Sequence, residues 1–293
     1  MTLQTQIIFG LFLVSLLVTY GNLQWNQPVV SILNRWVRWI ITSLLIASSA
    51  VEFQWSGRPF WLIALTTFLG WFVLETLYNW AIISALSRSP IPLFPRFQRN
   101  SDGDEWPATK QFILLRDWLR SQGFSKLQSV KASLDDTVAI RSSIYQNEDR
   151  TIRCQVMFFP GRSARMSVSY VLSTQTKEGE LVITDNVCLP FGGYYPDTWF
   201  IERKPLYRSL CRLMKFHRRR IQRDAVNVEA WDEDEPLEEL NRQQRTLEQI
   251  NMQHGFLNRP EYQEEHGRIT GEGRYRLWKE IWLLNYFGST VQY

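Results

Sequence analysis

Residues 60–86 read FWLIALTTFLGWFVLETLYNWAIISAL, a stretch in which Glu75 is the only charged side chain. A helix of this length rises about 40 Å, enough to cross the roughly 30 Å hydrocarbon core of a bilayer with some tilt. Two shorter apolar runs precede it, at residues 7–23 and 37–53. Because hydrocarbon offers the backbone no hydrogen-bond partners, such runs are most stable as helices. The sequence therefore predicts a membrane anchor of three transmembrane helices within residues 1–86.

The rest of the chain is polar, and its charge is unevenly distributed. Residues 87–223 hold 23 Lys and Arg against 13 Asp and Glu, whereas residues 224–293 hold 7 against 14. Three prolines between residues 90 and 95 predict a stiff, extended linker over residues 87–106. We therefore expect a basic domain over residues 107–223 and an acidic, helical C-terminal region over residues 224–293.

Alternating apolar and polar residues dominate the first part of this soluble region and predict strands. The runs cover residues 127–134, 137–145, 151–159, 164–172 and 181–189. Short connections between them favour an antiparallel five-strand meander, and helical periodicity predicts helices at residues 107–122, 205–223, 236–254 and 274–287. The predicted fold is thus a three-helix membrane anchor followed by an α+β domain. The final helix is apolar nearly all round, so we expect it to be buried within the chain's own fold.

The arginines near the predicted membrane helices indicate the orientation, because positive residues stay on the cytoplasmic side. With the N-terminus outside, Arg35, Arg38 and the arginines after residue 86 lie inside, and Arg58 alone lies outside. Three cysteines without metal-ligand spacing fit a reducing compartment. We expect an integral membrane protein, in the plasma or inner membrane if the source is a bacterium, with a cytoplasmic C-terminal domain.

Glu75 and Asn79 form a candidate polar site inside the third apolar run. An ionisable group at membrane depth is costly, so by default it marks a functional position. The structural alternative is a carboxyl group near the inner interface that bonds a serine of the second helix.

A stripe of basic residues follows one side of the helix predicted at residues 205–223. Its apolar side carries leucines together with His217, which is more often packed than metal-bound in such a position. The stripe has three interpretations: a surface for anionic lipid, a surface for an acidic segment of this or another copy, or a solvated helix face. Its members are Arg208, Arg212, Lys215, Arg219 and Arg223.

The ends of the predicted strands bring a third group of residues to one edge of the sheet. Glycines, aromatic rings and charged groups gather there, which makes this edge the best place for a small ligand. The alternative is that the aromatic rings simply close the end of the core. The residues are Arg162, Gly192, Gly193, Tyr194, Tyr195 and Asp197.

No catalytic or metal-binding motif is present in the sequence: the three histidines stand far apart, and no nucleophile elbow or phosphate-binding loop occurs. We therefore expect no catalytic residues, metal or cofactor, and the sequence does not support an enzyme. The leading hypothesis is a structural or assembly subunit that docks a protein partner, or a second copy, at the bilayer, without nucleic acid. The alternatives are a membrane-tethered small-ligand sensor and a membrane enzyme or transport component that uses Glu75.

The arginine distribution predicts that a reporter fused after Tyr293 is active only in the cytoplasm. Paired fusions of a cytoplasm-active and an export-active reporter at the same position measure this directly. Activity of the export-dependent reporter alone would reverse the orientation.

Overall fold

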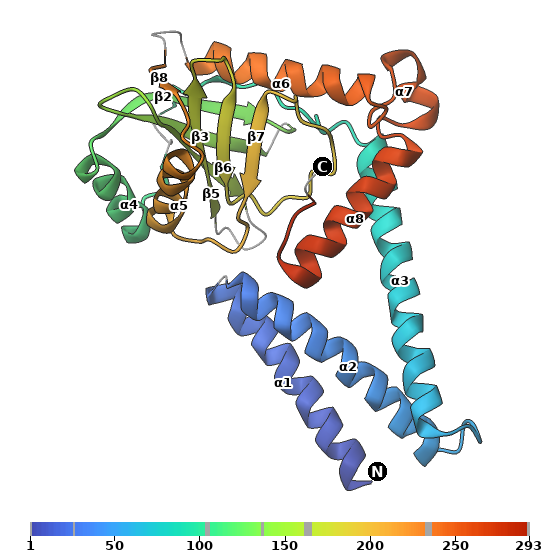
Figure 1. The fold of residues 1–293 in the computed structure, drawn as a ribbon. Coiled ribbons are helices and arrows are strands. Elements are labelled where there is room, and N and C mark those ends of the chain that lie inside the picture. The colour runs from blue at the N-terminus through green and yellow to red at the C-terminus, as the bar shows by residue number, and fades with distance from the viewer. Residues whose placement is uncertain are drawn as a thin grey trace. The chain divides into compact units, whose positions relative to one another are not determined.

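The computed structural model describes residues 2–25, 27–102, 106–135, 138–160, 166–231 and 236–291, with the backbone alone for residues 23–25. The chain divides into two compact units. We call Met1–Ala85 together with Arg274–Val291 the helical unit, and Leu86–Gly273 the sheet unit. Figure 1 shows the elements of both units in chain order.

Three helices dominate the helical unit: α1 (Leu3–Trp25), α2 (Pro28–Glu52) and α3 (Phe60–Arg88). Each is long and apolar enough to cross a membrane. Many of their large apolar side chains are exposed, as expected for helices in contact with lipid. The three predicted apolar helices are therefore present, and their length and composition suggest a membrane protein.

Helix α2 begins at Pro28, nine residues before the apolar run that predicted it. The added turns carry Asn34, and Arg38 lies at the start of the predicted run; the polar groups of both residues find partners on α1. Ser15 donates a 2.9 Å hydrogen bond to the Asn34 side-chain oxygen, and Arg38 reaches the Thr19 hydroxyl at 3.2 Å. Because these hydrogen bonds satisfy the polar groups between the helices, the helix extends through polar sequence that hydropathy alone would exclude.

Helix α8 (Gly271–Phe287) joins the helical unit from Arg274 onward. Trp282 lies against Phe72 with ring centroids 5.0 Å apart, and Tyr286 lies 5.4 Å from Trp39. The Trp36 indole N–H donates a 2.9 Å hydrogen bond to the Tyr286 carbonyl. Tyr286 is therefore buried and Trp282 partly buried within the chain's own fold, whereas Tyr275 and Phe287 of the same helix are exposed, so the expected burial of the final helix is only partial.

The sheet unit contains a mixed sheet of eight strands within the described residues. Neighbouring strands follow the order β1 to β7, and β8 pairs with β5. The first six strands pair antiparallel in sequence order, whereas β7 runs parallel to β6. The strands are β1 (Gln98–Arg99), β2 (Phe124–Ser133), β3 (Ala139–Asn147), β4 (Arg153–Pro160), β5 (Met166–Thr176), β6 (Leu181–Asp185), β7 (Trp199–Arg203) and β8 (Val228–Glu229).

The expected five-strand antiparallel meander therefore requires correction, because the sheet has additional strands and one parallel pair. Two of the additional strands, β1 and β8, are two residues long, too short for a period of two to be recognised. The last predicted strand also ends early, at Asp185. There the Asn186 side chain accepts a hydrogen bond from the Tyr170 N–H and donates one to the Tyr207 carbonyl, both at 2.7 Å. The chain thus turns away from the sheet.

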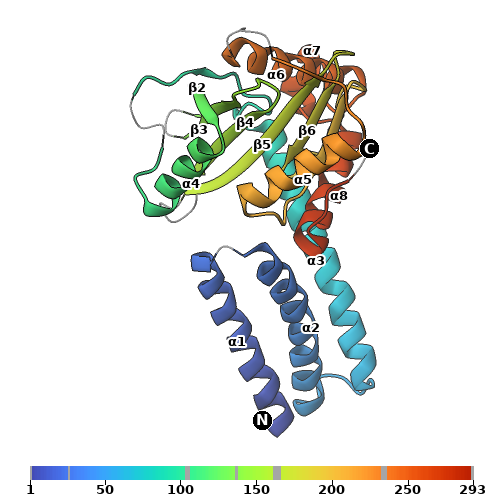
Figure 2. The same cartoon turned by 60° about the vertical axis from the view of Figure 1, so that its left-hand side comes forward.

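Helices cover both faces of this sheet (Figure 1, Figure 2). On one face α4 (Lys110–Ser121) and α5 (Leu210–Arg223) bury Leu119 and Leu213 against Val156 and Phe158 of β4. On the opposite face, side chains of α6 (Pro236–Gln253) pack against β2 and β3, and Trp231 packs against β6. The short helix α7 (Pro260–His266) precedes α8. The predicted helices are thus present with shifted ends, and α5 packs on one face of the sheet.

Candidate functional site

Helix α5 separates an apolar face from a strongly basic one. Leu210, Leu213 and Met214 are buried against the sheet, so the opposite side of the helix must face solvent. The side chains there are exposed, and none has an ion-pair partner within the described part of the chain. We call these four residues the cationic face of α5: Arg212, Lys215, Arg218 and Arg219.

The two remaining residues of the predicted basic stripe differ from this face. Arg208 precedes the helix and is partly buried, where it lines a groove beside α4. Arg223 is exposed, and its guanidinium pairs with Asp224 at 2.6 Å. Only the middle part of the predicted stripe therefore lies on the exposed side of α5 with positive charge that has no ion-pair partner within the described residues.

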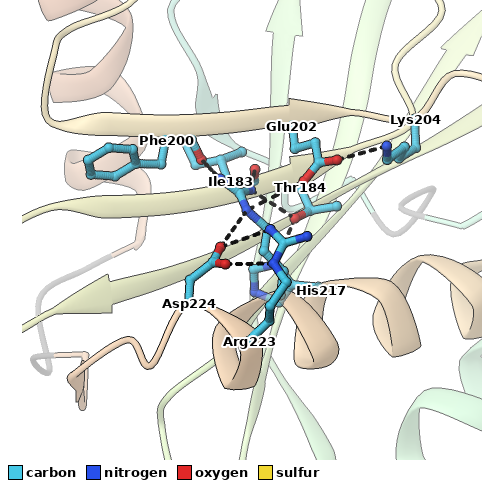
Figure 3. A network of polar contacts seen from close by, with 9 residues as sticks. Ile183, Thr184, Phe200, Glu202, Lys204, His217, Arg223 and Asp224 are labelled. Carbon is cyan, nitrogen blue, oxygen red and sulfur yellow. Dashed lines mark hydrogen bonds and ion pairs between the residues drawn. The ribbon is translucent and has the colours of Figure 1, made fainter.

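A buried polar network fixes the rotation of α5 on the sheet (Figure 3). The Arg220 guanidinium donates to the carbonyl oxygens of Ile183 at 2.8 Å and Phe200 at 3.0 Å. Arg220 also lies 3.6 Å from a carboxylate oxygen of Glu202 and 3.9 Å from one of Asp224. Because a buried guanidinium needs such partners, any other rotation of the helix would leave a charge unsatisfied.

His217 completes this network from the buried side of α5. Its Nδ1 lies 2.9 Å from the Thr184 hydroxyl and its Nε2 lies 3.1 Å from the Thr174 hydroxyl. Burial lowers the pKa of the His217 imidazole to about 3, and the nearby Arg220 adds to the shift. His217 is therefore neutral at pH 7, and both of its nitrogens are hydrogen-bonded to threonine, which agrees with a packed histidine.

The predicted ligand edge is packed against α6 where the structure describes it. Asn251 accepts a hydrogen bond from the Tyr194 N–H and donates one to the Tyr194 carbonyl, at 2.8 and 2.9 Å. A Cβ atom on Gly193 would lie 2.5 Å from the Asn251 side-chain oxygen, so this close approach requires glycine. Gly192 is also buried.

This packing favours a structural role for the loop, in which its aromatic rings close one end of the core. The Phe191 ring lies 4.7 Å from that of Tyr195, and the Tyr194 ring stacks on His254. Asp197 is exposed, and Arg162 lies outside the described residues. Ligand binding at this edge stays a prediction.

Glu75 of the helical unit is paired with groups from two other helices. Its carboxylate accepts a short hydrogen bond from the Tyr286 hydroxyl of α8 and lies 3.7 Å from the Arg35 guanidinium of α2. The Trp71 indole N–H also donates to it at 3.2 Å. Asn79, one turn further along α3, is buried. These partners give the carboxylate a structural role in holding α8 on the helical unit.

Sequence reasoning missed Tyr286, because hydropathy and periodicity do not connect residues that are 211 positions apart. Arg35 was recognised only as a signal of orientation. No group of three or more His, Cys, Asp or Glu residues is arranged to hold a metal ion within the described residues.

The buried His217 predicts that acid destabilises the sheet unit. Below pH 6.5 the unfolded chain takes up a proton at this position, whereas the native imidazole stays neutral down to about pH 3. The free energy of unfolding should therefore fall by about 1.4 kcal/mol per pH unit between these values from this residue alone. Urea unfolding of the full chain at pH 4 to 7 measures the slope.

His217→Gln removes one proton from the difference in protons bound by the unfolded and native chains, so it should lower this slope by about 1.4 kcal/mol per pH unit. His266→Gln, at an exposed position, should leave the slope unchanged. Equal slopes for the wild-type chain and His217→Gln would show that His217 does not titrate between the two states.

The Glu75–Tyr286 pair predicts coupling between α3 and α8. Glu75→Gln and Tyr286→Phe should each destabilise the helical unit, and the double variant should lose less than the sum, with a coupling of about 1 kcal/mol. Unfolding of the full chain, followed by the fluorescence of the tryptophans that surround Tyr286, measures this cycle. Tyr275→Phe, at a half-exposed position of the same helix, is the control, and simple additivity would contradict the pairing.

Comparison of the chain with protein-family models, with curated proteins and with solved structures finds no match. The function proposed below rests on the residues and geometry just described.

Proposed function

We propose that this chain is an integral membrane protein that docks a partner protein at the membrane surface through the cationic face of α5. In this proposal α1, α2 and α3 cross the bilayer with the N-terminus outside, and the sheet unit lies in the cytoplasm. The chain acts as a structural or assembly subunit, and no chemical step is assigned to it.

The observation that carries the proposal is the contrast between the cationic face and other cations of the sheet unit. Lys131 and Arg242 each pair with a carboxylate, of Asp102 and Glu239 respectively. The four cations of α5 have no such partner within the described residues, although they lie within eight positions of one another. Like charges at this spacing repel, so an acidic surface that neutralises them would gain binding free energy.

The rigidity of the support favours docking over a merely solvated face. Arg220 and His217 hold α5 in one rotation through hydrogen bonds to β5, β6 and β7. Because the helix is already held in place, its backbone loses little conformational entropy when a partner binds. The partner that this surface fits is an acidic protein surface, and charge complementarity would mainly increase the rate of association.

A photo-crosslinking amino acid at Gln222 tests the proposal in the full chain, in its native membrane. Gln222 is exposed and lies one turn from Arg218 and Arg219. We expect a discrete adduct with another protein, identified by mass spectrometry. Substitution of the whole cationic face by glutamine should reduce the adduct at least tenfold, and 0.5 M salt should also reduce it.

Arg120→Gln with Lys177→Gln is the matched control, because both cations are exposed elsewhere on the sheet unit. An adduct with lipid alone would replace the protein partner by the bilayer surface. An adduct within the same chain, or one insensitive to the substitutions, would reject docking through this face. The acidic residues 232–235 lie outside the described residues and are the candidates for such an internal partner.

A further inference from the structure

A groove of about 700 Å³ lies between α4 and α5 on one face of the sheet. Its volume is within the range of sites for one small organic ligand. Apolar side chains from both helices form its walls, a tyrosine of β5 lines it, and two basic residues also reach it. The residues that matter for its chemistry are Lys110, Leu114, Trp118, Tyr170, Arg208 and Leu210.

The positive groups of the groove come from the beginnings of its two helices. Lys110 is the first residue of α4, and Arg208 lies two residues before the start of α5. At the start of α5 the Ser209 side chain makes no capping hydrogen bond. Unbonded N–H groups at a helix N-terminus attract anions, and both helices present that end here. No Asp or Glu is among the described residues that line the groove.

Tyr170 provides an independent sign of a ligand. Its side chain is 4% exposed and lines the groove, yet its hydroxyl forms no hydrogen bond within the described part of the chain. Burial raises the pKa of the Tyr170 phenol, so the hydroxyl stays a hydrogen-bond donor at neutral pH. The hydroxyl belongs to a residue that lines the groove, so a ligand with an acceptor oxygen would give this donor a partner.

The rest of the groove is apolar and open. Leu115, Trp118 and Leu210 line it, and Leu114 beside them is 59% exposed. Ile113, on the neighbouring position of α4, is also exposed. An exposed leucine that lines an apolar groove marks a surface that an apolar ligand would cover.

We infer that this groove binds a fatty acid of about twelve carbons. Its carboxylate lies beside Lys110, Arg208 and the N-terminus of α5, where the Tyr170 hydroxyl can donate to it. Its acyl chain follows Leu114, Leu115 and Trp118. The carboxylate of such a ligand would pair with the basic residues of the lining, and its acyl chain would cover the apolar residues. This site uses other residues than the cationic face of α5 and goes beyond the docking function.

Cys211 lines the groove and gives a direct readout of occupancy. In a Cys188→Ser chain it is the accessible thiol among the cysteines, because Cys154 is buried. The full chain is placed in phosphatidylcholine nanodiscs, and the rate of maleimide alkylation is measured with and without laurate. We expect laurate to slow the alkylation at least tenfold, whereas dodecanol or inorganic phosphate should leave the rate within twofold of the unliganded value.

Substitution of both cations, Lys110→Gln with Arg208→Gln, should raise the laurate concentration for half-protection at least tenfold. Tyr170→Phe, which keeps the ring, should raise it several-fold. Arg218→Gln with Arg219→Gln is the matched control, since these cations lie on the exposed side of α5 away from the groove lining. It should leave the half-protection concentration unchanged.

A diazirine-bearing twelve-carbon fatty acid tests the wild-type chain without any substitution. We expect its adducts on peptides of α4 and of the start of α5, and laurate should compete with them. Equal protection by dodecanol would overturn the carboxylate site, and protection by phosphate alone would overturn the acyl site. Alkylation that laurate does not slow, together with adducts elsewhere in the chain, would reject the groove as a fatty-acid site.

Discussion

The buried guanidinium of Arg220 is the interaction on which the arrangement of the sheet unit depends. It connects α5 to carbonyl oxygens of both β6 and β7, the one parallel pair of strands among those described. A charge removed from water must keep all of these partners, so the helix has one rotation on the sheet. The neutral His217, bonded to two threonines, reinforces the same rotation. The exposed cations of α5 follow from this constraint, because they occupy the side that the sheet cannot cover.

In the helical unit, too, polar groups among apolar residues are paired, in this case between helices. Ser15 and Asn34 connect α1 with α2, while Arg35, Glu75 and Tyr286 connect α2, α3 and α8. In an apolar environment such contacts cost less than unpaired groups, and they also fix which helix faces meet. Glu75 is therefore accounted for by its structural partners, and the transport alternative gains no support from a carboxylate that is already bonded.

Two surfaces of the sheet unit have the character of binding sites, and their chemistry differs. The cationic face of α5 is open and polar, which suits the acidic surface of a macromolecule. The groove between α4 and α5 combines an apolar wall with two cations and a tyrosine, which suits a small amphiphile. The loop at Gly193, by contrast, packs closely against Asn251, and the Phe191 ring beside it lies against Phe256, which favours a structural role.

The sequence by itself determined the features that depend on local pattern: three apolar helices, the amphipathic faces of α5, and a packed His217. Period and run length encode which side of an element is apolar, so these features follow without knowledge of any partner. Only the tertiary structure decided the parallel β7, the early start of α2 and the bonding of Glu75 to Tyr286. The groove also depends on the tertiary structure, because Lys110 and Arg208 lie about 100 positions apart and line one groove only when two helices pack on the same sheet face. Contacts between distant segments depend on packing and on the need to satisfy buried polar groups, and no local pattern records them.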